Sequence, residues 1–168
     1  MSDTEKTLQE ALRALPICAG LDPAELERLS QALTPITVSR GDAVFKEGTA
    51  SKAMYLLARG KVEVRLLKRE KPIAVLRAPT VFGEMGVLTS SPHCATIVAA
   101  SAVELYALSA TRYEEFLANA DLVAYKVGLN LARILAERLR EVDSQLEGKK
   151  ELGEFATVRE RLMRDWSY

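Results

Sequence analysis

Few cysteines, a single histidine and no net charge limit what this 168-residue chain can be. The two cysteines, Cys18 and Cys94, are too few and too far apart for a disulfide framework or a zinc site, so we expect free thiols in a reducing compartment. Lys plus Arg and Asp plus Glu both number 23, which argues against a protein that binds a polyanion mainly by neutralising its phosphates. Zero net charge is still compatible with a small anionic ligand in a pocket.

Long hydrophobic runs are also missing. The first ten residues are polar and charged where a signal peptide needs an apolar run, and no window approaches the length of a membrane span. The sequence has no P-loop, no Ser/His/Asp set and no carboxylate pair suited to acid–base catalysis. We therefore expect a cytoplasmic protein without enzymatic activity, built as one domain with one or two peripheral helices.

Helical and β-rich segments follow one another along the chain. Residues 4–15 have apolar side chains at helical spacing, and Asp22-Pro23 predicts the N-cap and first position of a second helix. After Pro35, turns rich in glycine and proline separate short β-rich runs at 36–38, 43–45, 53–57, 61–67, 73–76, 94–99 and 103–108. This pattern predicts an α+β, mainly β fold: a double-stranded β-helix, or jelly roll, with N-terminal helices, a C-terminal helix pair and a tail helix.

Helical spacing returns after Ser109, first in a short capped helix and then in a long helix from Asp121 to about Glu147. One apolar stripe runs along the long helix: Val127, Leu131, Leu135, Leu139, Val142 and Leu146. The stripe can pack on the chain's own sheet, but a helix that outruns a small barrel would expose its distal positions, so we favour partial contact in a homodimer.

Four parts are predicted: N-terminal helices (1–35), a β jelly roll (36–109), a short helix with a long hinge or dimer helix (110–147), and an amphipathic tail (148–168).

The strongest functional signal lies in residues 82–96. The segment begins Phe82-Gly83-Glu84-Met85-Gly86-Val87-Leu88 and ends Ser91-Pro92-His93-Cys94-Ala95-Thr96. This spacing predicts a strand that ends in a glycine turn, then a carboxylate, one short helical turn and a return into a second strand. Such a turn directs free backbone N–H groups at whatever lies before it, as helix N-termini do when they hold phosphate.

The order of these parts resembles the cyclic nucleotide-binding domain family, which includes the sensor domains of catabolite-activator-type regulators and of protein kinase regulatory subunits. The glycine-punctuated hairpin motifs at 45–48 and 54–64 support the resemblance, which covers Leu8 to Leu146. It implies a small cyclic nucleotide, cAMP or cGMP, as the ligand, and a signal passed to a protein partner.

The resemblance also implies roles for individual residues. Glu84 stands where the family's glutamate accepts a hydrogen bond from the ribose 2′-hydroxyl, although an acid at a helix N-terminus is also stabilised by the helix dipole without any ligand. Gly83 and Gly86 match positions where the backbone turns sharply or approaches the ligand, and an ordinary surface turn is the alternative. The predicted ligand-binding set is Gly83, Glu84, Met85, Gly86, His93, Cys94, Ala95 and Arg138.

His93 departs from the family pattern, which has an arginine there to neutralise the cyclic phosphate. A hydrogen bond to a charged group contributes about 1.5–3 kcal/mol, or about one to two decades of affinity. An unperturbed imidazole, with a pKa of about 6.5, is mostly neutral at pH 7, and Cys94 adds only a weak donor. We therefore predict weaker binding or a different ligand, with binding that strengthens as the pH falls toward 6.

Two other functions stay open on the sequence. A ligand-free interaction or dimerisation module would use the long helix and tail. A haem or redox sensor would use His93, but His93 and Cys94 are neighbours in an extended segment and point to opposite faces, so they cannot easily share one iron. Residues 148–168 have room for one helix with nearly balanced charges, so we expect no direct DNA binding. Arg138 either supplies a charge to the site or is a solvated surface arginine.

Overall fold

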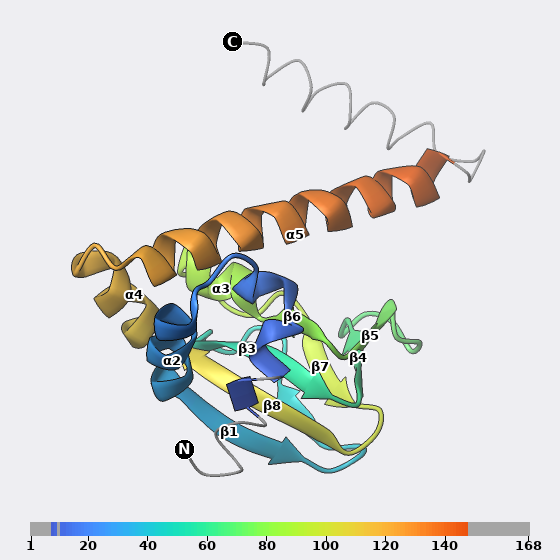
Figure 1. Cartoon of the computed structure of the whole chain (residues 1–168). Helices are drawn as coiled ribbons and strands as arrows, with labels where there is room; N and C mark the ends of the chain where they lie inside the picture. The colour runs from blue at the N-terminus through green and yellow to red at the C-terminus, as the bar shows by residue number, and fades with distance from the viewer. Residues whose placement is uncertain (1–7, 10, 148–168) are drawn as a thin grey trace. The chain divides into compact units, whose positions relative to one another are not determined.

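A computed structural model of the protein describes residues 8, 9 and 11–147, except for the side chains of 145–147. The chain divides into two compact units, Met1–Leu131 and Ala132–Tyr168. The predicted tail helix and most of the N-terminal half of the first predicted helix lie outside the described residues. Figure 1 shows the elements: η1 (Pro16–Cys18), α2 (Pro23–Ala32), β1 (Leu33–Val38), β2 (Ala43–Phe45), β3 (Ala53–Arg59), β4 (Lys61–Arg65), β5 (Ala74–Arg77), β6 (Thr80–Phe82), α3 (Glu84–Thr89), β7 (Thr96–Ala99), β8 (Val103–Ser109), α4 (Ala110–Ala118) and α5 (Leu122–Glu147).

The strands form two four-stranded antiparallel sheets, with the orders β1-β8-β3-β6 and β2-β7-β4-β5. Both sheets contribute to one apolar core: Leu57, Phe82, Val103 and Leu105 come from the first sheet, and Val62, Ile97 and Ala99 from the second. The core therefore lies between the two sheets. The predicted mainly β jelly roll is confirmed.

Strand boundaries differ from the prediction where pairing, rather than local composition, decides them. β1 begins at Leu33 and not at residue 36, because residues 33–35 pair with 106–108 of β8. Pro35 is compatible with this because β1 is the last strand of its sheet, where one edge needs no N–H donors. β7 begins at Thr96 and not at Cys94, and β4 ends at Arg65 and not at residue 67.

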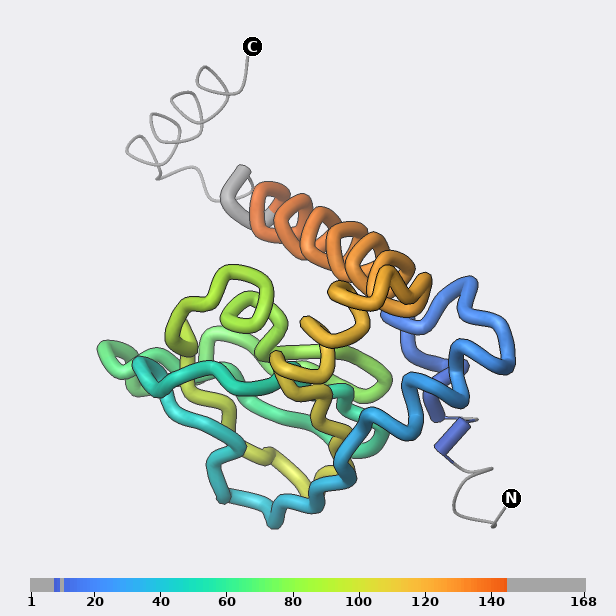
Figure 2. The backbone as a smooth tube through the Cα atoms, turned by 90° about the vertical axis from the view of Figure 1, so that its left-hand side faces the viewer, coloured from blue at the N-terminus to red at the C-terminus, as the bar shows by residue number. Residues whose placement is uncertain are grey.

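The helices at the start of the chain are joined to the first turns of α5 by polar side chains, which we call the helical joint. Asp22 caps α2 as predicted, and it forms a capping box with Glu25. The Glu25 carboxylate also accepts a 2.6 Å hydrogen bond from Lys126 Nζ, and Arg28 Nε lies 3.1 Å from Asp121 Oδ2. The buried amide of Asn130 donates to the carbonyl oxygens of residues 17 and 19, at 3.0 and 2.8 Å. Figure 2 shows these segments side by side, η1 and α2 in blue and the start of α5 in orange.

The predicted apolar stripe of α5 has two different environments. Val127 and Leu131, in the first unit, are 1% and 0% exposed and belong to its core. Leu139 and Val142, in the second unit, are 59% and 51% exposed. Along the described part of the chain, no helix has both the length and the apolar character to cross a membrane.

Candidate functional site

The predicted glycine turn lies between β6 and α3, and Gly83 is its sharpest point. Gly83 has left-handed backbone angles (φ 76°, ψ 2°), and a Cβ there would lie 3.2 Å from Tyr55 Cδ2 and 3.3 Å from Phe45 Cε1. Glycine is thus required both by the backbone conformation and by the two rings beside it. The predicted order of strand, glycine turn and short helix is confirmed.

The first turn of α3 holds three of the predicted ligand-binding residues. Glu84 is 3% exposed, whereas Met85 is half exposed. Gly86 is buried, and a Cβ there would overlap the side chain of Ser51 and lie 2.8 Å from the carbonyl oxygen of Ser91. The backbone of this short helix is therefore packed tightly between two loops, one before β3 and one after α3.

His93 lies on the inner side of the segment that returns from α3. Its backbone N–H donates to the Thr49 carbonyl at 2.9 Å, and its own carbonyl accepts from Gly48 N–H at 2.8 Å. The imidazole is 6% exposed and stacks on the Phe45 ring, with 3.6 Å between ring centroids and 8° between planes. Burial lowers the pKa of His93 below its ordinary value of 6.5, so the ring is neutral at pH 7.

Cys94 and Ala95 complete the returning segment. Cys94 is an exposed free thiol and Ala95 is buried, so successive side chains alternate between the inner and outer sides. Arg138 lies on α5 in the second unit, outside the unit that contains the other predicted residues. Within the described residues, no group of three His, Cys, Asp or Glu side chains could hold a metal ion.

An aromatic cluster under the glycine turn was not predicted from the sequence. Phe45, Tyr55 and Phe82 come from three different strands, and their ring centroids lie 5.5–5.9 Å apart. His93 extends this cluster by its stack on Phe45. The rings were visible in the sequence as strand aromatics, but no local signal indicates that they meet. One face of the His93 ring therefore lies against an aromatic side chain.

A surface cavity of the first unit borders this site. It has a volume of about 290 Å³ and includes Ser51, Gly86, Ser91 and Glu114 in its wall. Ser51 Oγ is buried without a hydrogen-bond partner among the described residues. Another cavity, with a volume of about 420 Å³, lies between α2 and α4, and none of the predicted site residues lines it.

Comparison with known proteins agrees with this geometry. The chain is 33% identical over 139 residues to the cyclic AMP receptor protein of Thermus thermophilus, covering 81% of this chain and 62% of that protein. It is 32% identical over 106 residues to a cAMP-dependent protein kinase regulatory subunit of Yarrowia lipolytica, covering 63% and 28%. A solved cyclic nucleotide-binding domain from Methylobacillus flagellatus has the same fold, with a TM-score of 0.77 at 24% identity over 89% of this chain and 85% of that one.

The chain thus spans less than two thirds of the length of these two curated relatives. Residues 35–120, about half of the chain, match the family described as cyclic nucleotide-binding domain. This match covers strands β2 to β8, most of β1, the glycine turn, α3 and His93. The chain belongs to the cyclic nucleotide-binding domain family.

Proposed function

We propose that the protein is a regulatory sensor module whose binding of cyclic nucleotide is weak or altered, and that it signals to a protein partner. The observation that carries the proposal is the stack of the buried His93 imidazole on Phe45. Where the family has a guanidinium, this chain has a neutral ring that stacks on the ring of Phe45. A cyclic phosphate would find no permanent cation at residue 93.

The cost of this exchange follows from the chemistry of the two side chains. An arginine is always charged and offers a planar fork of donors to phosphate. A neutral imidazole has one donor, and protonating it here requires a cation to leave water for an aromatic environment. A ligand phosphate would favour the charged imidazolium. Because burial lowers the pKa of His93, the attraction between that charge and the phosphate develops only at a pH below 6.5.

Other parts of the site support residual binding. Gly83 and Gly86 have no side chains to cover the backbone at the start of α3. The buried Glu84 stands at the position of the family's ribose-binding carboxylate. We propose Met85, Cys94 and Ala95 as neighbours of the ligand through their backbone, and Arg138 as a charge supplied from α5. Apart from Arg138, which lies in the second unit, none of these residues supplies a fixed cation to the phosphate.

Signalling would follow from a population shift. A ligand that binds one placement of α4 and α5 better than another favours that placement by its difference in affinity. Two relatives are named as a cyclic AMP receptor protein and a protein kinase regulatory subunit, so a regulatory and non-catalytic role in the cytoplasm is the proposal for this chain. The exposed Leu139 and Val142 support dimerisation through α5.

Calorimetry of the full chain with cAMP and cGMP at pH 7.5 and pH 6 tests the proposal. We expect weak binding that is tighter at pH 6. The variant His93→Arg should gain about tenfold or more, because it restores the fixed charge. His93→Gln, which has donors but no charge, is the matched control and should gain nothing.

Circular dichroism establishes that each variant is folded before its affinity is compared. If the native chain and a folded His93→Arg variant give neither heat nor a thermal shift at millimolar nucleotide, the sensing proposal is wrong for these ligands. The ligand-free interaction module would then be the better description.

A further inference from the structure

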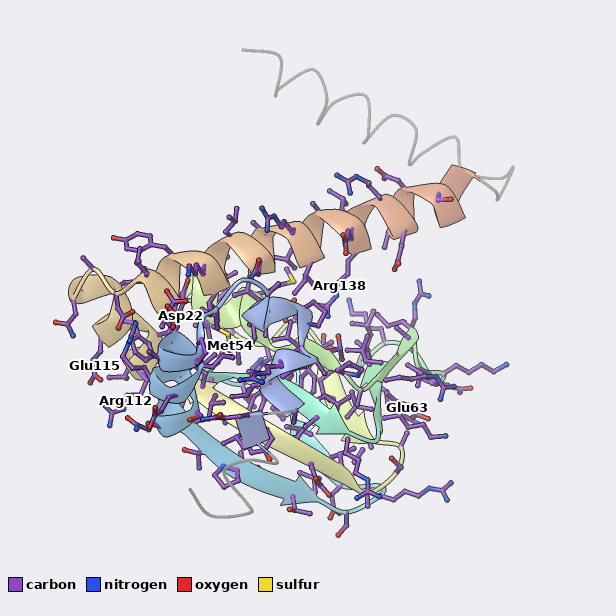
Figure 3. The ribbon with its side chains drawn as sticks, in the orientation of Figure 1. Asp22, Met54, Glu63, Arg112, Glu115 and Arg138 are labelled. Atoms are coloured by element: carbon purple, nitrogen blue, oxygen red, sulfur yellow. The ribbon has the colours of Figure 1, made fainter. Side chains whose placement is uncertain are left out.

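The hairpin formed by β4, β5 and their loop, residues 61–77, has a charge unlike the rest of the chain. Six basic residues and two glutamates give it a net charge of +4, although the whole chain is neutral. The basic residues of this hairpin, which we call the basic hairpin, are Lys61, Arg65, Lys68, Arg69, Lys71 and Arg77. Figure 3 shows several side chains with nitrogen ends in the region of β4 and β5, near the labelled Glu63.

Most of these cations form no ion pair among the described residues. Arg65 Nε donates to Glu63 at 2.9 Å, but Lys68, Arg69, Lys71 and Arg77 form no ion pair with any residue of the described part of the chain. Lys61 and Arg77 lie directly opposite each other across the β4 and β5 pair. Like charges in that position destabilise a sheet, and an anion beside them removes the repulsion.

The basic hairpin also exposes apolar side chains. Leu67 is 78% exposed, Ile73 47% and Val75 46%. Its loop is nevertheless held in place, because the Leu67 N–H donates to Glu47 Oε2 at 2.8 Å. The surface is therefore a fixed combination of cations and apolar groups, which is unusual for a region that only has to stay in water.

One edge of β5 is not paired with another strand of the sheet. β5 is the last strand of its sheet and pairs only with β4. Ala78 N–H donates to Gly60 at 3.0 Å, so in the alternating antiparallel pattern residues 76 and 78 point their backbone groups at β4. Val75 and Arg77 then point their N–H and C=O groups outward, toward the free edge.

We propose that an extended acidic segment of a partner protein docks on the basic hairpin as an added strand beside β5. Carboxylates of the segment lie against Lys61, Arg77 and the loop cations, and its apolar side chains lie on Val75 and Ile73. The inference rests on the proposed function only for the existence of a protein partner, and it requires no nucleotide.

Three other occupants fit the surface less well. A second copy of the chain would bring a basic edge against a basic edge, so lysines and arginines at this edge prevent self-association while attracting an acidic strand. An anionic membrane satisfies the cations but cannot pair with the backbone groups of Val75 and Arg77. Single-stranded nucleic acid binds through base stacking on aromatic rings, and residues 61–77 contain none.

The test is an NMR and calorimetric titration of the full chain with the peptide acetyl-(Glu-Val)4-Glu-amide in the absence of nucleotide. We expect the amides of Val75 and Arg77 to shift most, and the affinity to fall about tenfold or more when Lys68, Arg69 and Lys71 are together changed to glutamate. Val75→Pro removes an outward N–H and no bond to β4, so it should also lose about tenfold. The control Val75→Thr should stay within about twofold of the native affinity.

Two matched probes complete the experiment. The peptide acetyl-(Lys-Val)4-Lys-amide should not bind, and vesicles containing phosphatidylserine should bind no better to the native chain than to the charge-reversed variant. The inference is overturned if the acidic peptide gives no shifts at Val75 and Arg77 at millimolar concentration, if the basic peptide binds equally, or if only the vesicles bind. A failed nucleotide titration changes none of these outcomes.

Discussion

The candidate site and the helical joint each hold distant segments of the chain together, the site through apolar contacts and the joint through polar ones. At the site, Gly83, His93 and the rings of Phe45 and Tyr55 meet through close contact and apolar stacking. At the joint, the segments meet through the ion pairs of Glu25 and Arg28 and through a buried amide. A stacked site is sensitive to shape and to the charge of one ring, whereas the joint depends on keeping the buried Glu25 and Asn130 paired with their partners. The difference indicates that the site is held by fit and the joint by polar pairing.

The largest expected effect comes from removing the centre of the stacked site. Phe45→Ala should lower the free energy of unfolding by about 2–4 kcal/mol, because it leaves a cavity and removes the ring on which His93 lies. The pKa of His93 should rise toward 6.5 as water reaches it. Urea denaturation and an NMR titration of this single histidine measure both changes.

Phe45→Leu is the matched control for that variant, since it keeps apolar volume and loses the ring. It should cost less than about 1.5 kcal/mol. An unchanged urea midpoint in Phe45→Ala would contradict the view that the stack stabilises the site.

The corresponding change in the joint is Asn130→Leu. This substitution leaves the carbonyl oxygens of residues 17 and 19 without their buried donor, which should cost about 1–3 kcal/mol. The neighbouring Leu129 is 54% exposed, so Leu129→Ala should stay within about 0.5 kcal/mol of the native protein. Equal stability of the two variants would show that the amide does not hold the joint together.

Two glycines separate backbone strain from close packing. Gly20, in the joint, and Gly83, in the site, both have positive φ, but a Cβ has open space only at Gly20. Alanine should cost about 1–2 kcal/mol at Gly20 from strain alone, and about 1 kcal/mol more at Gly83 because of the rings. Thermal unfolding of the two variants measures the difference, and equal costs would mean that the rings move aside freely.

The smallest effect expected is on the dependence of stability on pH. Burial lowers the pKa of His93. The contribution of this histidine to the free energy of unfolding is therefore complete above pH 6.5 and is lost as the pH falls below that value. In the joint, hydrogen bonds from Lys126 and Arg28 lower the pKa values of Glu25 and Asp121 below their ordinary 4.5 and 3.8. The contribution of the joint is therefore lost only at pH values below about 4.5.

Denaturation at pH 7.5, 5.5 and 4 distinguishes these two ranges. His93→Phe, which keeps a ring on Phe45, should abolish the loss between pH 7.5 and 5.5 and leave the loss near pH 4. A variant that still loses stability in the upper range would exclude His93 as its origin.

Features that depend on neighbouring residues were predictable from the sequence, and features that depend on distant pairing were not. The cap at Asp22 and the turn at Gly83 follow from local backbone chemistry, and both are confirmed. The start of β7 at Thr96, the stack of His93 on Phe45 and the carbonyl partners of Asn130 depend on segments far away in the chain. No periodicity or motif encodes them, because they arise only when the sheets close.

The exchange of arginine for histidine could be identified from the sequence, but its physical meaning could not. The sequence indicated a weaker phosphate clamp at residue 93. The structure adds that the ring is buried, and burial lowers the pKa of His93 and so disfavours the charged imidazolium.

Glu47 gives the molecule a short mechanical link between two of its surfaces. Its backbone N–H donates to Thr96 Oγ1 at 3.0 Å, at the end of the candidate site, and its carboxylate accepts the Leu67 N–H in the loop of the basic hairpin. Glu47 thus connects the segment proposed to contact a nucleotide with the loop proposed to contact a partner, through two hydrogen bonds. Thermodynamic linkage is reciprocal, so a ligand that raises the affinity for a partner by some factor has its own affinity raised by that partner by the same factor.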